Sequence, residues 1–199
     1  ITDPSHPVTL PELQYGYRTQ PMTWSDVQQI LTRHPQPDVA QLTRSYDQQR
    51  VYQIFQYHMK QQYVSSTDYL LISKFGFQAV VSEMIDPTTP TMDGATKKIQ
   101  KWKAQQTLAE IENSRIILIE NDFPYYFEKD IKHYVLWKIK DKITHHELHS
   151  ALDQLQTTTT AFLPHQVVTE TLHWTNPPNL QSLPDIDHVH ILCHLSKTI

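Results

Sequence analysis

Cysteine and glycine are nearly absent from this sequence, with one Cys and three Gly among 199 residues. The single thiol, Cys193, cannot form an intramolecular disulfide, which favours a reducing compartment. We therefore expect the cytoplasm, with the nucleus as the alternative. The sequence has no glycine-rich phosphate loop, no CxxC pair and no GxSxG motif. The P-loop, zinc-ribbon and serine-hydrolase classes therefore lack support.

Clustered basic charge and long apolar runs are also missing. The 17 Lys and Arg residues are outnumbered by 21 Asp and Glu residues, and the formal net charge is −4. Binding of nucleic acid requires a concentrated basic surface, so we expect no nucleic-acid partner. No run of apolar residues approaches the 18 that a membrane span requires, and residues 1–21 lack the basic-then-apolar order of a signal peptide. We therefore expect no membrane association.

Helical patterns dominate the first half of the chain. Thr23 precedes apolar positions at helical spacing, and Pro35 stops that pattern. Ser45 can cap a second helix, and Gly76 can close a third. Prolines and threonines indicate a loop over 86–96. We predict an extended arm over 1–21 and helices over 23–34, 45–63, 68–75 and 96–113.

Strand patterns dominate the second half. Residues 116–119 are four consecutive apolar residues, which is typical of a buried strand. Thr144 and Glu147 form a capping box that opens a helix, and the four threonines 157–160 indicate a loop after it. Further strands are predicted over 133–139, 167–174 and 188–195. The predicted fold class is α+β, with a helical region (22–95) packed on a mostly antiparallel sheet region (96–199) in one compact unit.

The sharpest local motif is His188-Val189-His190 on the last predicted strand. Residues i and i+2 of a strand share a face, so both imidazoles point the same way. Such a pair can ligate a metal, act as nucleophile or acid and base, or simply pack. His133 begins another predicted strand, and the two strands could bring the three histidines together.

A loop stiffened by prolines precedes this motif and carries Asn176, Gln181 and Ser182. These neutral polar side chains suit the binding of a ligand, or form self-bonded turns in a rigid connector. Elsewhere, His145, His146 and His149 lie at the start of a predicted helix. Positions i and i+4 could bind a metal there, but HExxH is absent, and we interpret the three as a solvated helix face.

Five segments, in this order, resemble the fungal N-acetylglucosamine-induced protein family: TWSDVQQIL, LTRSYDQQRVY, QQYVSSTDYLLISKFGF, ENDFPYYFEKDIKHYVLWKI and WTNPPNLQSLPDIDHVHIL. The resemblance covers about residues 22 to 195, nearly the whole chain. It implies an intracellular protein of fungal type. That family is a domain of unknown function with no established catalytic residues, so the resemblance implies no reaction.

Residues 115–195 alone resemble a second group, the histidine-triad superfamily of nucleotide hydrolases and transferases. The shared order is strand, turn, His-initiated strand, helix, strand, then Asn, Gln-Ser and His-X-His. This resemblance implies a histidine-triad-like fold in which His190 is the nucleophile and His188 the first histidine. The chain departs from the pattern at Leu192, where a third histidine would stand, and at Lys132, where a glycine would stand.

The expected function is binding of a nucleotide or nucleotide sugar, with a hydrolase or nucleotidyltransferase reaction left open. The alternatives are a non-catalytic binding or regulatory protein, and a mononuclear metal site in which His133 or His173 joins the histidine pair. The expected partner is a phosphate-bearing small molecule whose affinity weakens as pH rises through about 6.5–8, where imidazoles lose their charge. No cofactor is specified, and no residue is assigned to a metal. The candidate catalytic residues are His190 and His188, and the candidate ligand-binding residues are His133, Asn121, Asn176, Gln181 and Ser182.

Overall fold

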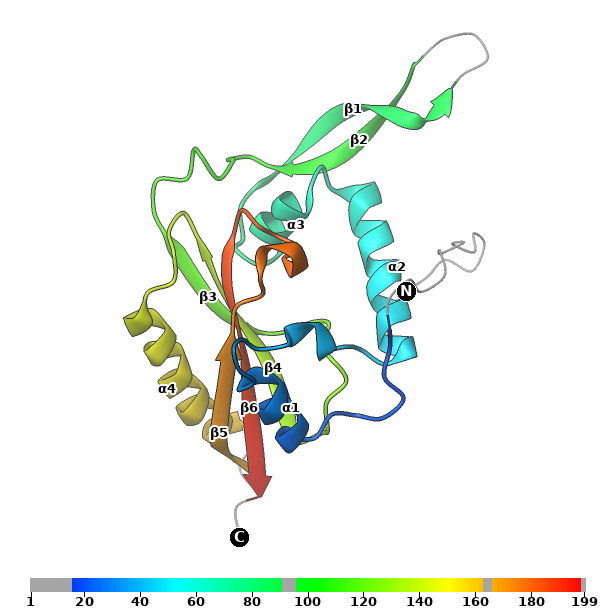
Figure 1. Ribbon diagram of the computed structural model, residues 1–199. Helices are drawn as coiled ribbons and strands as arrows, with labels where there is room; N and C mark the ends of the chain where they lie inside the picture. Colours follow the sequence, from blue (N-terminus) through cyan, green and yellow to red (C-terminus); the bar gives the residue numbers. More distant parts are fainter. Residues whose placement is uncertain (1–15, 91–95, 163–165, 198–199) are drawn as a thin grey trace.

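The computed structural model describes residues 16–90, 96–162 and 166–197, and is shown in Figure 1. Most of the arm predicted over 1–21 lies outside these residues. The elements are, in order, α1 (Trp24–Leu31), the 3₁₀ turn η1 (Val39–Gln41), α2 (Tyr46–Gln62), α3 (Ser66–Ser73), β1 (Ala79–Pro90), β2 (Thr96–Ala104), β3 (Arg115–Glu120), β4 (Ile131–Ile139), α4 (His145–Phe162), β5 (Gln166–Trp174), η2 (Pro178–Leu180) and β6 (Asp187–Lys197). None of the helices described is long and apolar enough to cross a membrane.

The first two helices begin where their capping residues predict. Thr23 accepts a hydrogen bond from the Asp26 backbone N–H, and the Asp26 carboxylate accepts one from the Thr23 N–H. Ser45 and Gln48 form the same reciprocal arrangement at the start of α2. Each box satisfies two backbone donors that a helix start would otherwise leave unpaired.

A four-stranded antiparallel sheet in the order β3-β4-β6-β5 forms the centre of the protein and confirms the α+β class. α4 covers one face, where Ala151 and Leu155 pack against Val189, Ile191 and Cys193 of β6. The other face carries the even-numbered residues of β6, including both candidate histidines.

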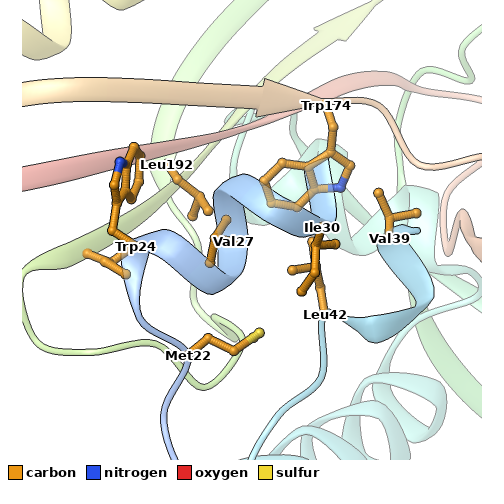
Figure 2. Close-up of a cluster of buried hydrophobic side chains, with 9 residues drawn as sticks. Met22, Trp24, Val27, Ile30, Val39, Leu42, Trp174 and Leu192 are labelled. Carbon is orange, nitrogen blue, oxygen red and sulfur yellow. The ribbon is translucent and has the colours of Figure 1, made fainter. Parts of the chain in front are cut away.

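α1 and the segment after it cover this second face, as Figures 1 and 2 show. Trp174 of β5 and Leu192 of β6 pack directly against Val27 and Ile30 of α1. Other buried members of the cluster are Met22, Trp24, Val39, Leu42 and Ile131. The N-terminal helical half therefore packs on the C-terminal sheet, as predicted.

The helix predicted over 96–113 was wrong, and so was the loop predicted over 86–96 at residues 86–90 and 96, while residues 91–95 lie outside the described residues. Residues 79–90 and 96–104 pair as the antiparallel hairpin β1–β2, which projects away from the sheet in Figure 1. The helical spacing of Ile99 and Trp102 was misleading because tertiary contacts override it. Trp102 pairs with Val81, and its carbonyl accepts a hydrogen bond from Val64 after α2. The region 22–95 is therefore helical only as far as Ser73.

The loop predicted at threonines 157–160 was also wrong, because α4 continues through them to Phe162. The Thr157 hydroxyl donates a hydrogen bond to the Asp153 carbonyl one turn earlier, 3.0 Å away. A threonine can satisfy its hydroxyl within a helix in this way, so a threonine run does not by itself end one.

Phe55 of α2 forms an aromatic cluster with Phe123, at 4.5 Å between ring centroids, and with Tyr69, at 5.1 Å. Its side chain is half-buried. We therefore expect Phe55→Ala to lower the free energy of unfolding by about 2–3 kcal/mol, less than the 3–5 of a fully buried Phe. Urea denaturation measures this change. Val51 on the same helix is 57% exposed, and Val51→Ala should change stability by less than about 0.5 kcal/mol. Equal effects of the two substitutions would contradict the cluster.

Candidate functional site

The two histidines of β6 lie side by side on the face that α1 covers, and both are buried, with 3% of His188 and 8% of His190 exposed. Antiparallel pairing sets His190 between Val135 of β4 and Trp174 of β5. The Trp174 indole stacks on the His190 ring, with centroids 4.8 Å apart. The two imidazoles themselves meet edge to face at 5.5 Å.

His133 of β4 lies in direct contact with His190. Its Nε2 is 3.0 Å from His190 Nδ1, and only 2% of His133 is exposed. On the other side of the same ring, His190 Nε2 is 3.1 Å from the side-chain nitrogen of Asn176. The Asn176 oxygen accepts a hydrogen bond from Trp174 Nε1 at 2.9 Å. The structure therefore brings together three of the predicted residues, midway along β4 and β6, where β5 ends at Trp174.

The tryptophan determines where every proton in this network lies. An indole N–H can only donate, so the oxygen of Asn176 faces Trp174 and its NH₂ group faces His190. His190 Nε2 must then accept, which leaves the ring proton on Nδ1. That proton is donated to His133 Nε2, so the His133 proton lies on Nδ1. Both imidazoles are therefore neutral, and both nitrogens of His190 are hydrogen-bonded.

Burial lowers the pKa values of these histidines. Desolvation is the main cause for His190, whose pKa falls to about 3, with smaller contributions from His188 and Arg44. The pKa of His133 lies well below the ordinary value, again through desolvation first, then through His190 and Arg44. Desolvation also lowers the pKa of His188, although its hydrogen bond to Ile186 opposes the effect. The expectation that these imidazoles lose their charge between pH 6.5 and 8 was therefore wrong for the unliganded protein.

His188 differs from His190 in its hydrogen bonding. Its Nδ1 donates to the carbonyl of Ile186 at 3.0 Å, which leaves the lone pair on Nε2. The ring stacks on Trp137 with centroids 4.7 Å apart. His188 is therefore held in the tautomer that a nucleophilic Nε2 requires.

A partly buried arginine beside the network, Arg44, was not predicted from the sequence. The Arg44 guanidinium lies over the rings of Tyr52, 4.1 Å from its centroid, and Tyr125, 5.3 Å away. Its Nε and one terminal nitrogen donate to the carbonyl of Phe123 at 3.1 and 2.9 Å. Among residues 16–90, 96–162 and 166–197, no carboxylate lies within 4.0 Å of this cation. Among the described residues, Arg44 is therefore a partly buried positive charge without an acidic partner.

Tyr125 connects this arginine to the histidine network. Its ring stacks on His133, with centroids 5.6 Å apart, and burial raises the pKa of its hydroxyl, with Arg44 and Asn176 opposing that shift. The aromatic turn of residues 121–127, which supplies Tyr125 and the Phe123 carbonyl, was the signal in the sequence that could have located this part of the site.

The remaining predicted ligand-binding residues have different surroundings. Gln181 donates to the backbone carbonyl of Asn176 at 2.7 Å and so holds the loop before β6. The Asn121 side-chain nitrogen lies 3.4 Å from both ring nitrogens of His133, too far for a well-formed bond to either, while its oxygen accepts from the Phe123 N–H. Ser182 is exposed on the loop. Asn121 and Asn176 thus adjoin the histidines, Gln181 acts through the backbone, and Ser182 stands apart.

The metal alternative finds no support at this face. His173 pairs with Ile191 in the sheet register, so it lies on the opposite face from His188 and His190. Within the described part of the chain, no group of three His, Cys, Asp or Glu side chains is arranged to hold a metal ion. A hollow of about 410 Å³ lies between Leu108, Lys140, Lys142 and Asp185, and none of the histidines lines it.

These features define the class: an α+β protein with a buried network of neutral histidines and, beside it, an arginine with no carboxylate partner in the part of the chain that the structure describes. The model of the family described as "Protein of unknown function (DUF3605)" matches residues 23–194, so the chain belongs to that family. It is 26% identical over 183 residues to N-acetylglucosamine-induced protein 1 of Candida albicans, an alignment that covers 86% of this chain and 68% of that protein. The resemblance to the fungal N-acetylglucosamine-induced family is thereby confirmed. A solved structure titled "Crystal Structure of HTC1" aligns with 90% of this chain and 85% of its own, at 19% identity and a TM-score of 0.47.

Proposed function

We propose that the protein binds a phosphate-bearing small molecule, of the nucleotide or nucleotide-sugar class, with Arg44 as the principal anion contact. The single observation that carries this proposal is the guanidinium beside the histidine network, which has no carboxylate partner among the described residues. A buried charge is costly unless it is paired. A bound phosphate group would supply the missing negative charge, and arginine is the residue best suited to bidentate phosphate recognition.

The surrounding groups suit such a ligand as well. Two guanidinium N–H groups have no partner among the contacts found in the described residues, because Phe123 and Gln49 engage the other three. The rings of Tyr52 and Tyr125 hold the guanidinium in one orientation, so little side-chain entropy is lost on binding. Aromatic rings around a cation also provide a surface on which a base can stack.

The geometry favours binding over turnover at His190. A nucleophilic imidazole requires a nitrogen with a free lone pair, and both nitrogens of His190 are hydrogen-bonded. A hydrolase or nucleotidyltransferase reaction is the second candidate, and the bond from His188 Nδ1 to Ile186 favours His188 as its nucleophile. In that reaction the Nε2 lone pair would attack phosphorus and the leaving group would depart with the bonding electrons. Water or an acceptor would then take the phosphoryl or nucleotidyl group.

Calorimetric titration with a panel of nucleotides, nucleotide sugars and inorganic phosphate tests the proposal. We expect wild type to bind at least one organic phosphate, and Arg44→Gln to weaken that binding by about tenfold or more, the loss of one charge-assisted contact. Affinity should change little between about pH 7 and pH 8, because Arg44 stays charged, the pKa values of His133 and His190 are strongly lowered, and a terminal phosphate is already ionised above its pKa of about 6.

Arg115 offers a matched control, because it also lies over an aromatic ring, 4.5 Å from the centroid of Phe77, but at the other end of β4 from His133. Arg115→Gln should leave the affinity unchanged. An absence of binding by wild type at millimolar ligand, or equal binding by wild type and Arg44→Gln, would refute the proposal. Turnover of a bound nucleotide that disappears in His188→Ala would establish the second candidate.

A further inference from the structure

Three exposed histidines lie together on the surface formed by α4 and β5, on the face of the sheet opposite to Arg44. His145 and His149 are one helical turn apart on α4, and their Nε2 atoms are 3.0 Å from each other. His173 lies on β5, the strand against which α4 packs. The charges of His149 and His145 lower the pKa of His173, after desolvation as the larger cause, so the three imidazoles lie within electrostatic reach of one another.

The convergence of two Nε2 atoms is the geometry of a metal chelate. Two imidazole nitrogens that bind one Zn²⁺ tetrahedrally at 2.0–2.1 Å are separated by about 3.3 Å. The observed 3.0 Å differs from this value by only a few tenths of an ångström. Histidines at i and i+4 of a helix supply such a pair in the HExxH motif of metalloproteases, where the spacing and not the intervening residues places both rings on one side.

We propose that His145 and His149 form a two-histidine clamp for a transition-metal ion with a preference for imidazole, such as Cu²⁺, Ni²⁺ or Zn²⁺. In this structure His173 does not complete a group of three ligands with the pair. It becomes the third ligand when its side chain rotates toward the bound ion. Affinity should follow the usual order for nitrogen ligands, with Cu²⁺ bound more tightly than Ni²⁺ or Zn²⁺. This site is independent of the proposed phosphate site.

The surroundings of the pair allow such an ion to enter. His145 and His149 are both exposed, so their nitrogens exchange water for a metal without opening the core. In the absence of a metal the 3.0 Å contact is an N–H···N hydrogen bond between the two rings, a weak interaction at the surface. The neighbouring histidine, His146, is also exposed but points about 100° around the helix from His145. It therefore cannot share the site.

Titration of the full metal-free chain with CuCl₂ and ZnCl₂, followed by calorimetry and by copper electron paramagnetic resonance, tests this site. We expect one ion per chain and a copper spectrum with nitrogen hyperfine splitting. His145→Ala and His149→Ala should each weaken Cu²⁺ binding by at least about tenfold, the loss of one of two principal ligands. His173→Ala should have a smaller effect of about threefold, that of a ligand recruited last.

The other histidines of the chain make controls essential, since the sequence contains 12. His146→Ala is the matched control and should bind copper as wild type does. Because alanine favours helix, the variants should retain their helical circular dichroism. Undiminished binding in the double variant His145→Ala/His149→Ala would overturn the proposal, and so would a loss in His146→Ala equal to that in His149→Ala. Equal binding by His173→Ala and wild type would refute the role of His173.

Discussion

Acid is expected to unfold this protein at a pH well above that at which its carboxylates titrate. An unfolded histidine takes up a proton as the pH falls below about 6.5. In the folded protein the pKa of His190 is about 3, and the pKa of His133 is also well below the ordinary value, so both rings stay neutral at pH values where the unfolded chain is protonated. The stability that these neutral histidines contribute is therefore complete above pH 6.5 and is lost as the pH falls. As the pH falls below 6.5, each such group lowers the free energy of unfolding by about 1.4 kcal/mol per pH unit, so the pair lowers it by close to 3 kcal/mol per unit.

Urea denaturation at several pH values between about 7 and 4.5 measures this slope. Replacing one member of the pair, in His133→Phe, should reduce the slope by about 1.4 kcal/mol per pH unit, whatever it does to stability at pH 7. His146→Ala removes an exposed imidazole and should leave the slope unchanged. A free energy of unfolding that stays constant from pH 6.5 to 4.5 would contradict the buried neutral network.

Much of the fold could be predicted because local signals and tertiary structure agree. The capping boxes at Thr23, Ser45 and Thr144 start their helices as predicted, since a cap acts through residues three positions away. The strand patterns of the second half are equally local. Residues 116–119 form β3 as predicted, but the prediction that this strand is buried was wrong, because β3 lies at the edge of the sheet and Ile116 is exposed. The hairpin of residues 79–104 could not be found in this way. Its strands are stabilised by pairing with each other and by contacts such as the bond from the Ala104 N–H to Asp68.

The candidate site was also predictable only where local patterns determine it. Strand alternation places His188 and His190 on one face, and the His-initiated strand brings His133 to them, because antiparallel neighbours share a face. Arg44 is 89 positions from His133 in the sequence, and only the folding of its loop against the 121–127 turn brings them together. The degree to which the histidine rings are buried was the second property that the sequence could not reveal. A sequence indicates which rings can be charged, but the pKa of His190 depends on how much water the packed helix α1 excludes.

The largest effect expected on the other face of the sheet concerns a partly buried ion pair. Lys138 of β4, with 7% of its side chain exposed, donates to both carboxylate oxygens of Glu147 in α4, at 2.8 and 2.9 Å, and to the Lys142 carbonyl. The Lys138 hydrogen bond is the main cause that lowers the pKa of Glu147 to about 2. We expect Glu147→Leu to lower the free energy of unfolding by about 2–3 kcal/mol, somewhat less than for a fully buried pair because Glu147 remains partly exposed to water.

Glu147 also accepts hydrogen bonds from Thr144 at the helix cap. Two further variants therefore distinguish the contribution of the ion pair to stability from that of the cap. Thr144→Ala removes the capping hydroxyl but keeps the charge, and should cost only about 1 kcal/mol. Lys138→Met/Glu147→Leu removes both charges and should recover most of the loss of the single variant, since no buried cation is left without a partner. Urea denaturation at pH 7 measures all three. If the double variant is as unstable as Glu147→Leu, the loss of stability comes from the cap and from packing, and the unpaired charge of Lys138 is not its cause.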